Sequence, residues 1–390
     1  MKEIVLLVNG PGELYTWVRP VLRELREQAP SLRVVLGLLP CPFATGYERG
    51  IAETLPLDAL ASVAQILEFM AGGRKPAAFV GSSGLVLGLG GDVAFPGRIA
   101  QRLGYVAWRY SFEPYWKNSL ERLFVHDEKT LASALRVGAK AENIGNLVAD
   151  ALTLEPNGQR EANSVLFLPG SRSFQVVHLL GVAAAVAERL PGASFHISRS
   201  SLVDQATWAL ALSGEKSKPF EGLTLRQEGR YAYTPNGTRL EVHHEQDRYA
   251  LMKRCAIAIT SPGTNTLELG IAGIPSVVCM PLQKMELIPT ESVLRYLEWL
   301  PVVGKPLKRA VVLAYLRRFK YISLPNMLSD EAVFTELRGA VTVQMVADAA
   351  KALLENQTER ARIEARLVAT MPRAGAAKRL VQKILERVGV

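Results

Sequence analysis

Short apolar runs, each followed by a glycine turn and a helical pattern, recur along this chain and limit its fold more than any other feature. Near the N-terminus, residues 4–8 form an apolar run, residues 9–13 a glycine-rich turn, and residues 18–25 place apolar side chains at helical spacing. A second apolar run follows over residues 34–39. Strand, turn, helix and strand in this order indicate the βαβ unit of a parallel sheet.

The alternation continues and then restarts after a polar segment. We expect a helix over residues 57–70 and buried strands over residues 78–80 and 85–89. Residues 154–163 are polar and rich in turn-forming residues, which indicates a linker. Beyond it the sequence again shows strands, glycine turns and helices, and the last fifty residues have a helical pattern.

The sequence therefore predicts an α/β fold of two Rossmann-like domains that face a central cleft, with C-terminal helices. Residues 1–155 form the N-terminal domain and residues 156–370 the C-terminal domain. A last helix over residues 371–390 is expected to pack back on the N-terminal domain. Ligands of open parallel sheets bind at the carboxyl ends of the strands, so the functional residues are expected there.

The composition narrows the classes of partner. The net charge of +9 favours anionic partners, either phosphorylated substrates or an anionic membrane surface. No nucleic-acid-binding motif accompanies this charge, so no nucleic-acid partner is expected. Three well-separated cysteines and five histidines show no metal-ligand spacing, so we expect neither a metal nor a disulfide framework. No apolar run is long enough to span a membrane, and the cysteine usage fits a cytoplasmic location.

Residues 261–268, with the sequence SPGTNTLE, follow a predicted strand and begin a helix. Gly263 lets a ligand approach the backbone, and the free amide groups around Thr264 form a site for a phosphate. Glu268 lies one turn further along, where its carboxylate can accept hydrogen bonds from ribose hydroxyls. A capped helix in an ordinary turn between strand and helix explains the same pattern.

Two further segments of the second domain place polar residues at turns. Residues 166–172, LFLPGSR, form another strand and glycine turn, with Ser171 and Arg172 at its mouth. The guanidinium could neutralise a diphosphate leaving group. Asn326 lies in a proline turn and could hydrogen-bond a sugar or the edge of a base. Solvated loops also contain such residues.

The first domain offers two carboxylates at predicted strand ends. Gly12 and Glu13 follow the first strand, and Asp92 follows two glycines after a later one. Sugar transfer with inversion needs one base that deprotonates the acceptor hydroxyl. Either carboxylate could serve as this base, and either could equally cap a helix or a turn.

Taken in order, these segments resemble those of the bacterial lipid-A-disaccharide synthases. The matching segments are residues 168–172 (LPGSR), 261–268 with 273–278 (GIPSVV), 323–326 (SLPN) with Glu336 and Leu337, and 144–150, which resembles the family's GHPLVD. The first turn departs from the family and is closer to the NGxGE turn of lipid-A-disaccharide-synthase-like proteins of unassigned substrate. Asp92 also lies one position off the family's register, so the resemblance does not decide whether Asp92 or Glu13 is the catalytic base.

The resemblance implies a GT-B fold and an inverting hexosyltransferase of lipid A biosynthesis or related glycolipid metabolism. Its donor would be a UDP-linked sugar of the N-acetylglucosamine type and its acceptor a lipid or lipid-linked sugar, with neither metal nor cofactor. The enzyme would be cytoplasmic and peripheral on the inner face of the cytoplasmic membrane, and a homodimer stays open. Substrate contacts are expected from Gly12, Ser171, Arg172, Gly263, Thr264, Glu268, Asn326 and Glu336.

Two alternatives have the same fold. A UDP-sugar epimerase, such as the non-hydrolysing UDP-N-acetylglucosamine 2-epimerase, would convert the donor without a lipid, and a non-catalytic protein would only bind the nucleotide-sugar. Residues 301–320 are basic and amphipathic and contain no acid. This segment could contact an anionic membrane, a partner subunit or the core of its own domain.

Overall fold

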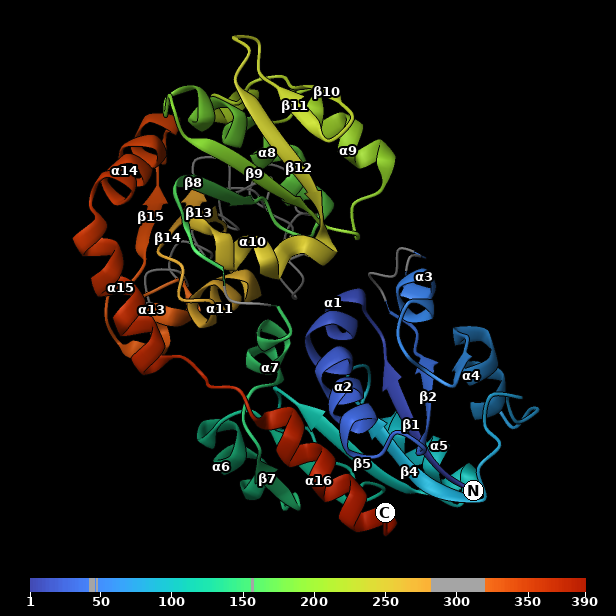
Figure 1. The fold of residues 1–390 in the computed structure, drawn as a ribbon. Helices are drawn as coiled ribbons and strands as arrows, with labels where there is room; N and C mark the ends of the chain where they lie inside the picture. Colours follow the sequence, from blue (N-terminus) through green and yellow to red (C-terminus); the bar gives the residue numbers. More distant parts are fainter. Residues whose placement is uncertain (42–45, 47, 156–157, 282–319) are drawn as a thin grey trace, which may run out of the picture. The chain divides into compact units, whose positions relative to one another are not determined.

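Two α/β units make up the chain in the computed structural model, which describes residues 1–41, 46, 48–155, 158–281 and 320–390 (Figure 1). The first unit combines Met1–Glu155 with Pro372–Val390, and the second spans Pro156–Met371. The C-terminal segment of the chain thus belongs to the N-terminal unit. The basic segment at residues 301–320 lies outside the described residues apart from Lys320.

The N-terminal unit is built on a seven-stranded parallel sheet of order β3-β2-β1-β4-β5-β6-β7. Its strands are β1 (Lys2–Val8), β2 (Arg33–Leu38), β3 (Ala59–Ala61), β4 (Ser83–Gly88), β5 (Val106–Ser111), β6 (Arg122–Val125) and β7 (Ala141–Asn143). The strand order changes direction between β1 and β4. In a doubly wound sheet this switch point leaves a crevice at the carboxyl ends of the strands, where ligands bind.

Helices cover both faces of this sheet because its central strands are apolar on both sides. Along β1, Ile4, Leu6 and Val8 belong to one buried cluster, and Val5 and Leu7 belong to another. The helices are α1 (Pro11–Glu13), α2 (Arg19–Gln28), α3 (Glu48–Glu53), α4 (Val63–Met70), α5 (Ala94–Leu103), α6 (Glu128–Arg136), α7 (Leu147–Thr153) and α16 (Ala376–Val388), with a π-helical stretch at Leu14–Val18.

The C-terminal helix α16 completes one of these two clusters. It packs against α2, α7 and β4, and Leu380, Val381 and Ile384 are fully buried there. Asp150 on α7 accepts hydrogen bonds from the backbone amides of Gly375 (2.7 Å) and Ala376 (3.0 Å). A carboxylate from another helix therefore satisfies amide groups at the start of α16.

The C-terminal unit contains an eight-stranded mixed sheet of order β10-β11-β12-β9-β8-β13-β14-β15. The strands are β8 (Glu161–Leu168), β9 (Ser194–Arg199), β10 (Arg226–Glu228), β11 (Tyr231–Tyr233), β12 (Arg239–His244), β13 (Cys255–Thr260), β14 (Ser276–Pro281) and β15 (Thr335–Gly339). From β12 to β15 the strands are parallel, and β10 and β11 add an antiparallel edge. The switch point lies between β8 and β13.

The helices of this unit follow its parallel strands. They are α8 (Ser173–Glu188), α9 (Gln205–Leu212), α10 (Arg248–Arg254), α11 (Thr264–Ile271), α13 (Leu324–Ser329), α14 (Val343–Glu355) and α15 (Gln357–Thr370), with 3-10 turns at Lys218–Phe220 and Glu245–Asp247. Among the described residues of the whole chain, no helix combines the length and the hydropathy that a bilayer crossing requires.

Two local predictions for the N-terminal unit differ from the structure. The expected helix over residues 57–70 begins only at Val63, because Ser62 and Gln65 form a capping box and the preceding residues pair with β2 as strand β3. Residues 78–80 form no strand. Instead, the Val80 amide donates to the buried Glu3 carboxylate at 3.2 Å.

Candidate functional site

Two turns between strand and helix lie next to each other at the switch point of the C-terminal unit. The first joins β8 to α8 and contains Ser171 and Arg172, and the second joins β13 to α11 and contains Gly263. The side-chain amide of Gln175 at the start of α8 donates to Ser261 Oγ of the second turn at 3.3 Å. The first turns of two helices therefore reach the same edge of the sheet.

The second turn requires glycine. Gly263 has φ 145° and ψ −167°, a backbone region that is open almost only to glycine. A Cβ atom at this position would meet no atom within 4 Å. Conformation and not crowding therefore selects the residue, and the backbone faces open space. Within the described part of the chain, no side chain caps the start of α11, and Thr264 is exposed. Uncapped amide groups at the positive end of a helix dipole suit an anion such as a phosphate.

Glu268 on the same helix joins a buried ion-pair network with residues of α10 and of the 3-10 turn before it. Its Oε1 accepts from Arg248 Nη2 (3.0 Å) and from the Tyr249 hydroxyl (3.2 Å), while Arg248 Nη1 also donates to Glu245 (3.2 Å). Burial disfavours the charge on Arg248, but Glu268, Tyr249 and Glu245 outweigh it and raise the pKa of Arg248. The other oxygen of Glu268 is buried and accepts no hydrogen bond from a described residue.

Asn326 and Glu336 form a tight internal clamp. Asn326 is fully buried. Its Nδ2 donates to Glu336 Oε1 (2.9 Å) and to the Phe334 carbonyl (3.0 Å), and its Oδ1 accepts from the Phe334 amide (2.7 Å). The polar atoms of the Asn326 side chain are thus occupied by the protein, and the residue lies in helix α13 and not in the expected proline turn.

The Glu336 carboxylate is the centre of this clamp. It accepts hydrogen bonds from the backbone amides of Ile322 (3.0 Å) and Ser323 (2.9 Å) and from the Ser323 hydroxyl (2.7 Å), and it pairs with Arg338. Burial acts to raise the pKa of Glu336, but these donors together lower it. Glu336 therefore stays ionised, and its carboxylate binds the backbone amides at the start of α13.

The clamp connects to the glycine turn through one hydroxyl. Thr266 Oγ1 donates to the Gly263 carbonyl (2.7 Å) and accepts from the Leu324 amide of α13 (3.1 Å). The structure thus brings Gly263, Asn326 and Glu336 into one connected region. Asn326 and Glu336 act on the turn through helix α13, because they hold this helix in place and its Leu324 amide contacts Thr266.

A separate pocket opens at the switch point of the N-terminal unit, which we call the N-terminal pocket. Its lining residues include Asn9, Glu13, Asp92, Arg109 and Glu113, and its volume is about 420 Å³. Both carboxylates that the sequence identified as candidate bases, on separate strand ends, therefore line one pocket. Gly12 lies in the short helix α1, which ends at Glu13.

The two carboxylates differ in their surroundings. Glu13 is partly buried, and burial raises the pKa of its carboxyl against a smaller opposing backbone hydrogen bond. Asp92 is exposed, and its Oδ1 accepts from the Ala94 amide (2.8 Å) at the start of α5. Asp92 thus holds the turn that leads into α5, one of the roles that the sequence left open, whereas the raised pKa of Glu13 favours Glu13 as the candidate for proton transfer.

Arg109 is not among the substrate-contact or catalytic residues that the sequence led us to expect. It is 6% exposed on β5, and its Nη2 donates to the Gly91 carbonyl (3.1 Å). Its Nε and Nη1 are buried and have no hydrogen-bond partner among the described residues. Burial lowers the pKa of its guanidinium, with Glu113 and Asp92 acting in the opposite direction. In the sequence, Arg109 stands among aromatic residues that fit an acceptor groove or core packing equally well, so the sequence alone did not single it out.

Comparisons with solved structures identify the fold. The chain is similar to UDP-GlcNAc 2-epimerase from Neisseria meningitidis bound to UDP-GlcNAc, with a TM-score of 0.53 and 14% identity. This match covers 99% of this chain and 100% of the neighbour. The UDP-GlcNAc 2-epimerase from Methanocaldococcus jannaschii matches with a TM-score of 0.55 and 11% identity, over 99% of this chain and 100% of the neighbour. For MnaA of S. aureus, solved with UDP, the TM-score is 0.56 and the identity is 12%. This match covers 100% of this chain and 97% of MnaA.

The fold is of the GT-B type. The two Rossmann-like units and the C-terminal helices predicted from sequence are confirmed by this likeness over the whole chain. At such low identity the likeness shows architecture and not the lipid-A-disaccharide synthase family, which stays a prediction. No protein-family model and no curated protein sequence matches the chain.

Proposed function

We propose that this GT-B protein is an enzyme that converts a UDP-linked amino sugar, with the diphosphate bound at the β8 and β13 edge of the C-terminal unit. The observation that supports this most is the pair of adjacent turns that begin α8 and α11. Backbone amides at two helix starts favour a diphosphate, and the exposed Arg172 adds a cation at the mouth of the first turn.

Glu268 supplies the second part of the proposal. A buried carboxylate oxygen without a partner is unfavourable unless a ligand provides the hydrogen bond. The hydroxyls of a ribose are suitable donors, and Arg248 and Tyr249 hold the carboxylate in place from the other side. Gly263, Thr264 and Ser171 would contact phosphate, while Asn326 and Glu336 would position α13.

Two reactions of a UDP-sugar are candidates, and the comparisons favour the first. The structural neighbours are UDP-GlcNAc 2-epimerases, which supports inversion at C2 of the sugar. The ordered LPGSR, SPGTNTLE and SLPN segments instead support transfer of the sugar to a lipid acceptor, with no metal or cofactor. Both reactions need a group that moves a proton, and Glu13 in the N-terminal pocket is our candidate.

One incubation separates the two reactions. The full chain is mixed with UDP-GlcNAc in deuterated water and followed by NMR, with and without a lipid-sugar acceptor. Epimerisation gives the 2-epimer with deuterium at C2 and needs no lipid. Transfer gives free UDP only when the acceptor is present. A chain that binds UDP but does neither is a non-catalytic nucleotide-sugar-binding protein, and a chain that does not bind UDP contradicts the proposal.

Substitutions test the assigned roles. Glu268→Gln is expected to weaken UDP binding measured by calorimetry, because the neutral amide is a poorer acceptor for ribose hydroxyls. The exposed Glu215→Gln is the matched control and should bind UDP like the wild type. Glu13→Gln should lower turnover while UDP affinity stays unchanged. The proposal fails if Glu268→Gln keeps full affinity and Glu13→Gln keeps full turnover.

A further inference from the structure

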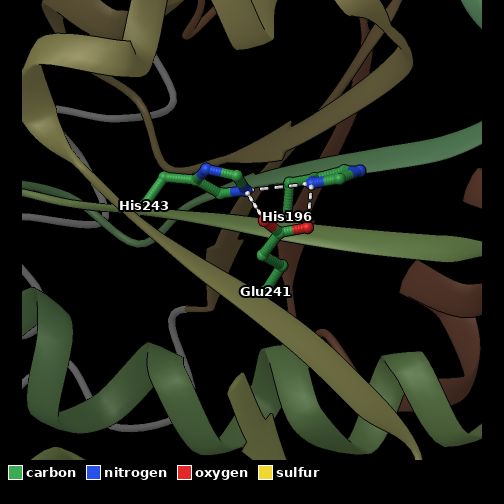
Figure 2. A group of neighbouring side chains, drawn as sticks. All are labelled: His196, Glu241 and His243. Carbon is green, nitrogen blue, oxygen red and sulfur yellow. Dashed lines mark hydrogen bonds and ion pairs between the residues drawn. The ribbon is translucent and has the colours of Figure 1, made fainter. Parts of the chain in front are cut away.

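Three metal-ligand side chains meet on one face of the C-terminal sheet (Figure 2). His196 belongs to β9, and Glu241 and His243 belong to the adjacent strand β12. In the parallel register of these strands, His196 pairs with Glu241, and His243 follows two residues later along β12. Side chains two residues apart on a strand project from the same face, so the sheet itself brings the three together.

The separations of their ligand atoms suit one metal ion. His196 Nδ1 lies 3.0 Å from His243 Nε2. The Glu241 carboxylate oxygens lie 3.8 Å from His196 Nδ1 and 3.7 Å from His243 Nε2. Ligands at about 2.0–2.1 Å from a tetrahedral zinc ion are roughly 3.4 Å apart. The observed separations lie on both sides of this spacing, so small side-chain adjustments would complete the site.

The second nitrogen of His196 has the environment of a metal ligand. Its Nε2 is buried and has no hydrogen-bond partner among the described residues. The nearest acid is Glu161 at the start of β8, with its Oε2 at 3.7 Å. Histidines that bind a metal usually direct their other N–H at a carboxylate, which fixes the orientation of the ring. Glu161 is placed to do this when Nδ1 binds the ion.

One cation competes for the same nitrogen. Arg254 Nη2 lies 3.3 Å from His196 Nδ1, while Arg254 Nε pairs with Glu161 Oε1 at 3.1 Å. The Arg254 side chain is 41% exposed, so it can withdraw toward solvent when a metal binds. Its positive charge should nevertheless weaken binding of a divalent cation.

We propose that His196, Glu241 and His243 form a binding site for a divalent transition metal of the zinc class, a site that was not expected from the sequence. Two imidazoles favour zinc, cobalt, nickel or copper over magnesium and calcium. Three protein ligands leave a fourth position for water. The ion would join β9 to β12, the strand that supports the antiparallel edge of β10 and β11, and so stabilise the C-terminal unit.

Titration of the chelator-treated full chain with zinc chloride tests the proposal, independently of any activity. We expect one zinc ion per chain by calorimetry and a higher melting temperature with zinc, because the ion binds only the folded site. Magnesium should produce neither effect. His196→Ala, His243→Ala and Glu241→Gln should each weaken zinc binding by roughly tenfold or more. Arg254→Gln should strengthen it, since it removes the competing cation.

The matched control is His244→Ala. His244 follows His243 on β12 and projects from the opposite face, so its loss should leave zinc affinity unchanged. Circular dichroism identifies any variant that fails to fold. If a histidine variant fails to fold, the zinc affinities of Glu241→Gln and Arg254→Gln test the site, because these substitutions keep similar side-chain sizes. Absence of zinc binding by the wild type, or equal weakening by His244→Ala, would overturn the proposal.

Discussion

The buried charges of this protein fall into two kinds, which differ in whether their hydrogen bonds are complete. The fully buried Glu3 accepts from Arg33 (3.1 Å), Val80 (3.2 Å) and Tyr105 (3.2 Å), so it holds the N-terminal sheet together. Glu268 and Arg109 instead keep buried polar atoms without a partner among the described residues. Unsatisfied buried polar atoms are unfavourable, so Glu268 and Arg109 are two of the residues to test for ligand contact.

The Arg248 network allows a prediction of stability. Arg248→Ala would leave Glu268 and Glu245 as buried charges without their cation. We expect the free energy of unfolding to fall by about 3–5 kcal/mol, measured by urea denaturation. Arg362→Ala is the control, because its ion pair with Glu359 lies on the surface, and its effect should stay within about 1 kcal/mol. Equal losses in the two variants would contradict this assignment.

Glu13 should link stability to pH. Its pKa is raised in the folded state, so folding becomes less favourable as pH rises from the ordinary value of 4.5 through the raised one. Glu13→Gln removes this penalty. We therefore expect the variant to melt at a higher temperature than the wild type at pH 7, and the difference to shrink toward pH 4. A difference that does not change with pH would show that burial does not shift this group.

At the scale of elements, Gly263 at the start of α11 and Gly12 in α1 make different demands on the backbone. Gly263→Ala forces a side chain into a conformation that only glycine adopts readily, so we expect a loss of about 1–3 kcal/mol of stability and weaker UDP binding. Gly12→Ala is the comparison, because no atom lies within 4 Å of the added Cβ and its φ is not positive. Denaturation and UDP titration of both variants check this, and equal behaviour would contradict it.

At the scale of the whole molecule, the chain ends in the unit where it began. Removing Pro372–Val390 would uncover the surface that Leu380, Val381 and Ile384 bury, each worth about 1.5–3 kcal/mol. This sum is comparable to the total stability of a typical domain. We expect hydrogen exchange in β1 to lose its protection in the truncated chain, while β8 and β13 keep theirs. Unchanged protection in β1 would refute the structural role of α16.

Local patterns in the sequence determined the larger features of this protein. Apolar runs, glycine turns and helical periodicity are properties of neighbouring residues, so strands such as residues 4–8, the turn at Gly263 and the two-unit α/β architecture could be predicted. The same patterns identified Glu13 and Asp92 as acids at strand ends. They did not predict β3, because a three-residue strand depends on its partner β2 and not on its own sequence.

Only the tertiary structure decided which distant side chains meet. His196 and His243 are 47 positions apart and lack the spacing of a helical or turn metal motif, yet the register of β9 against β12 brings their ring nitrogens to 3.0 Å. The unsatisfied atoms of Arg109 and Glu268 likewise depend on what the rest of the unit places around them. Periodicity fixes the face from which a residue projects, while strand pairing and packing decide what that face contacts.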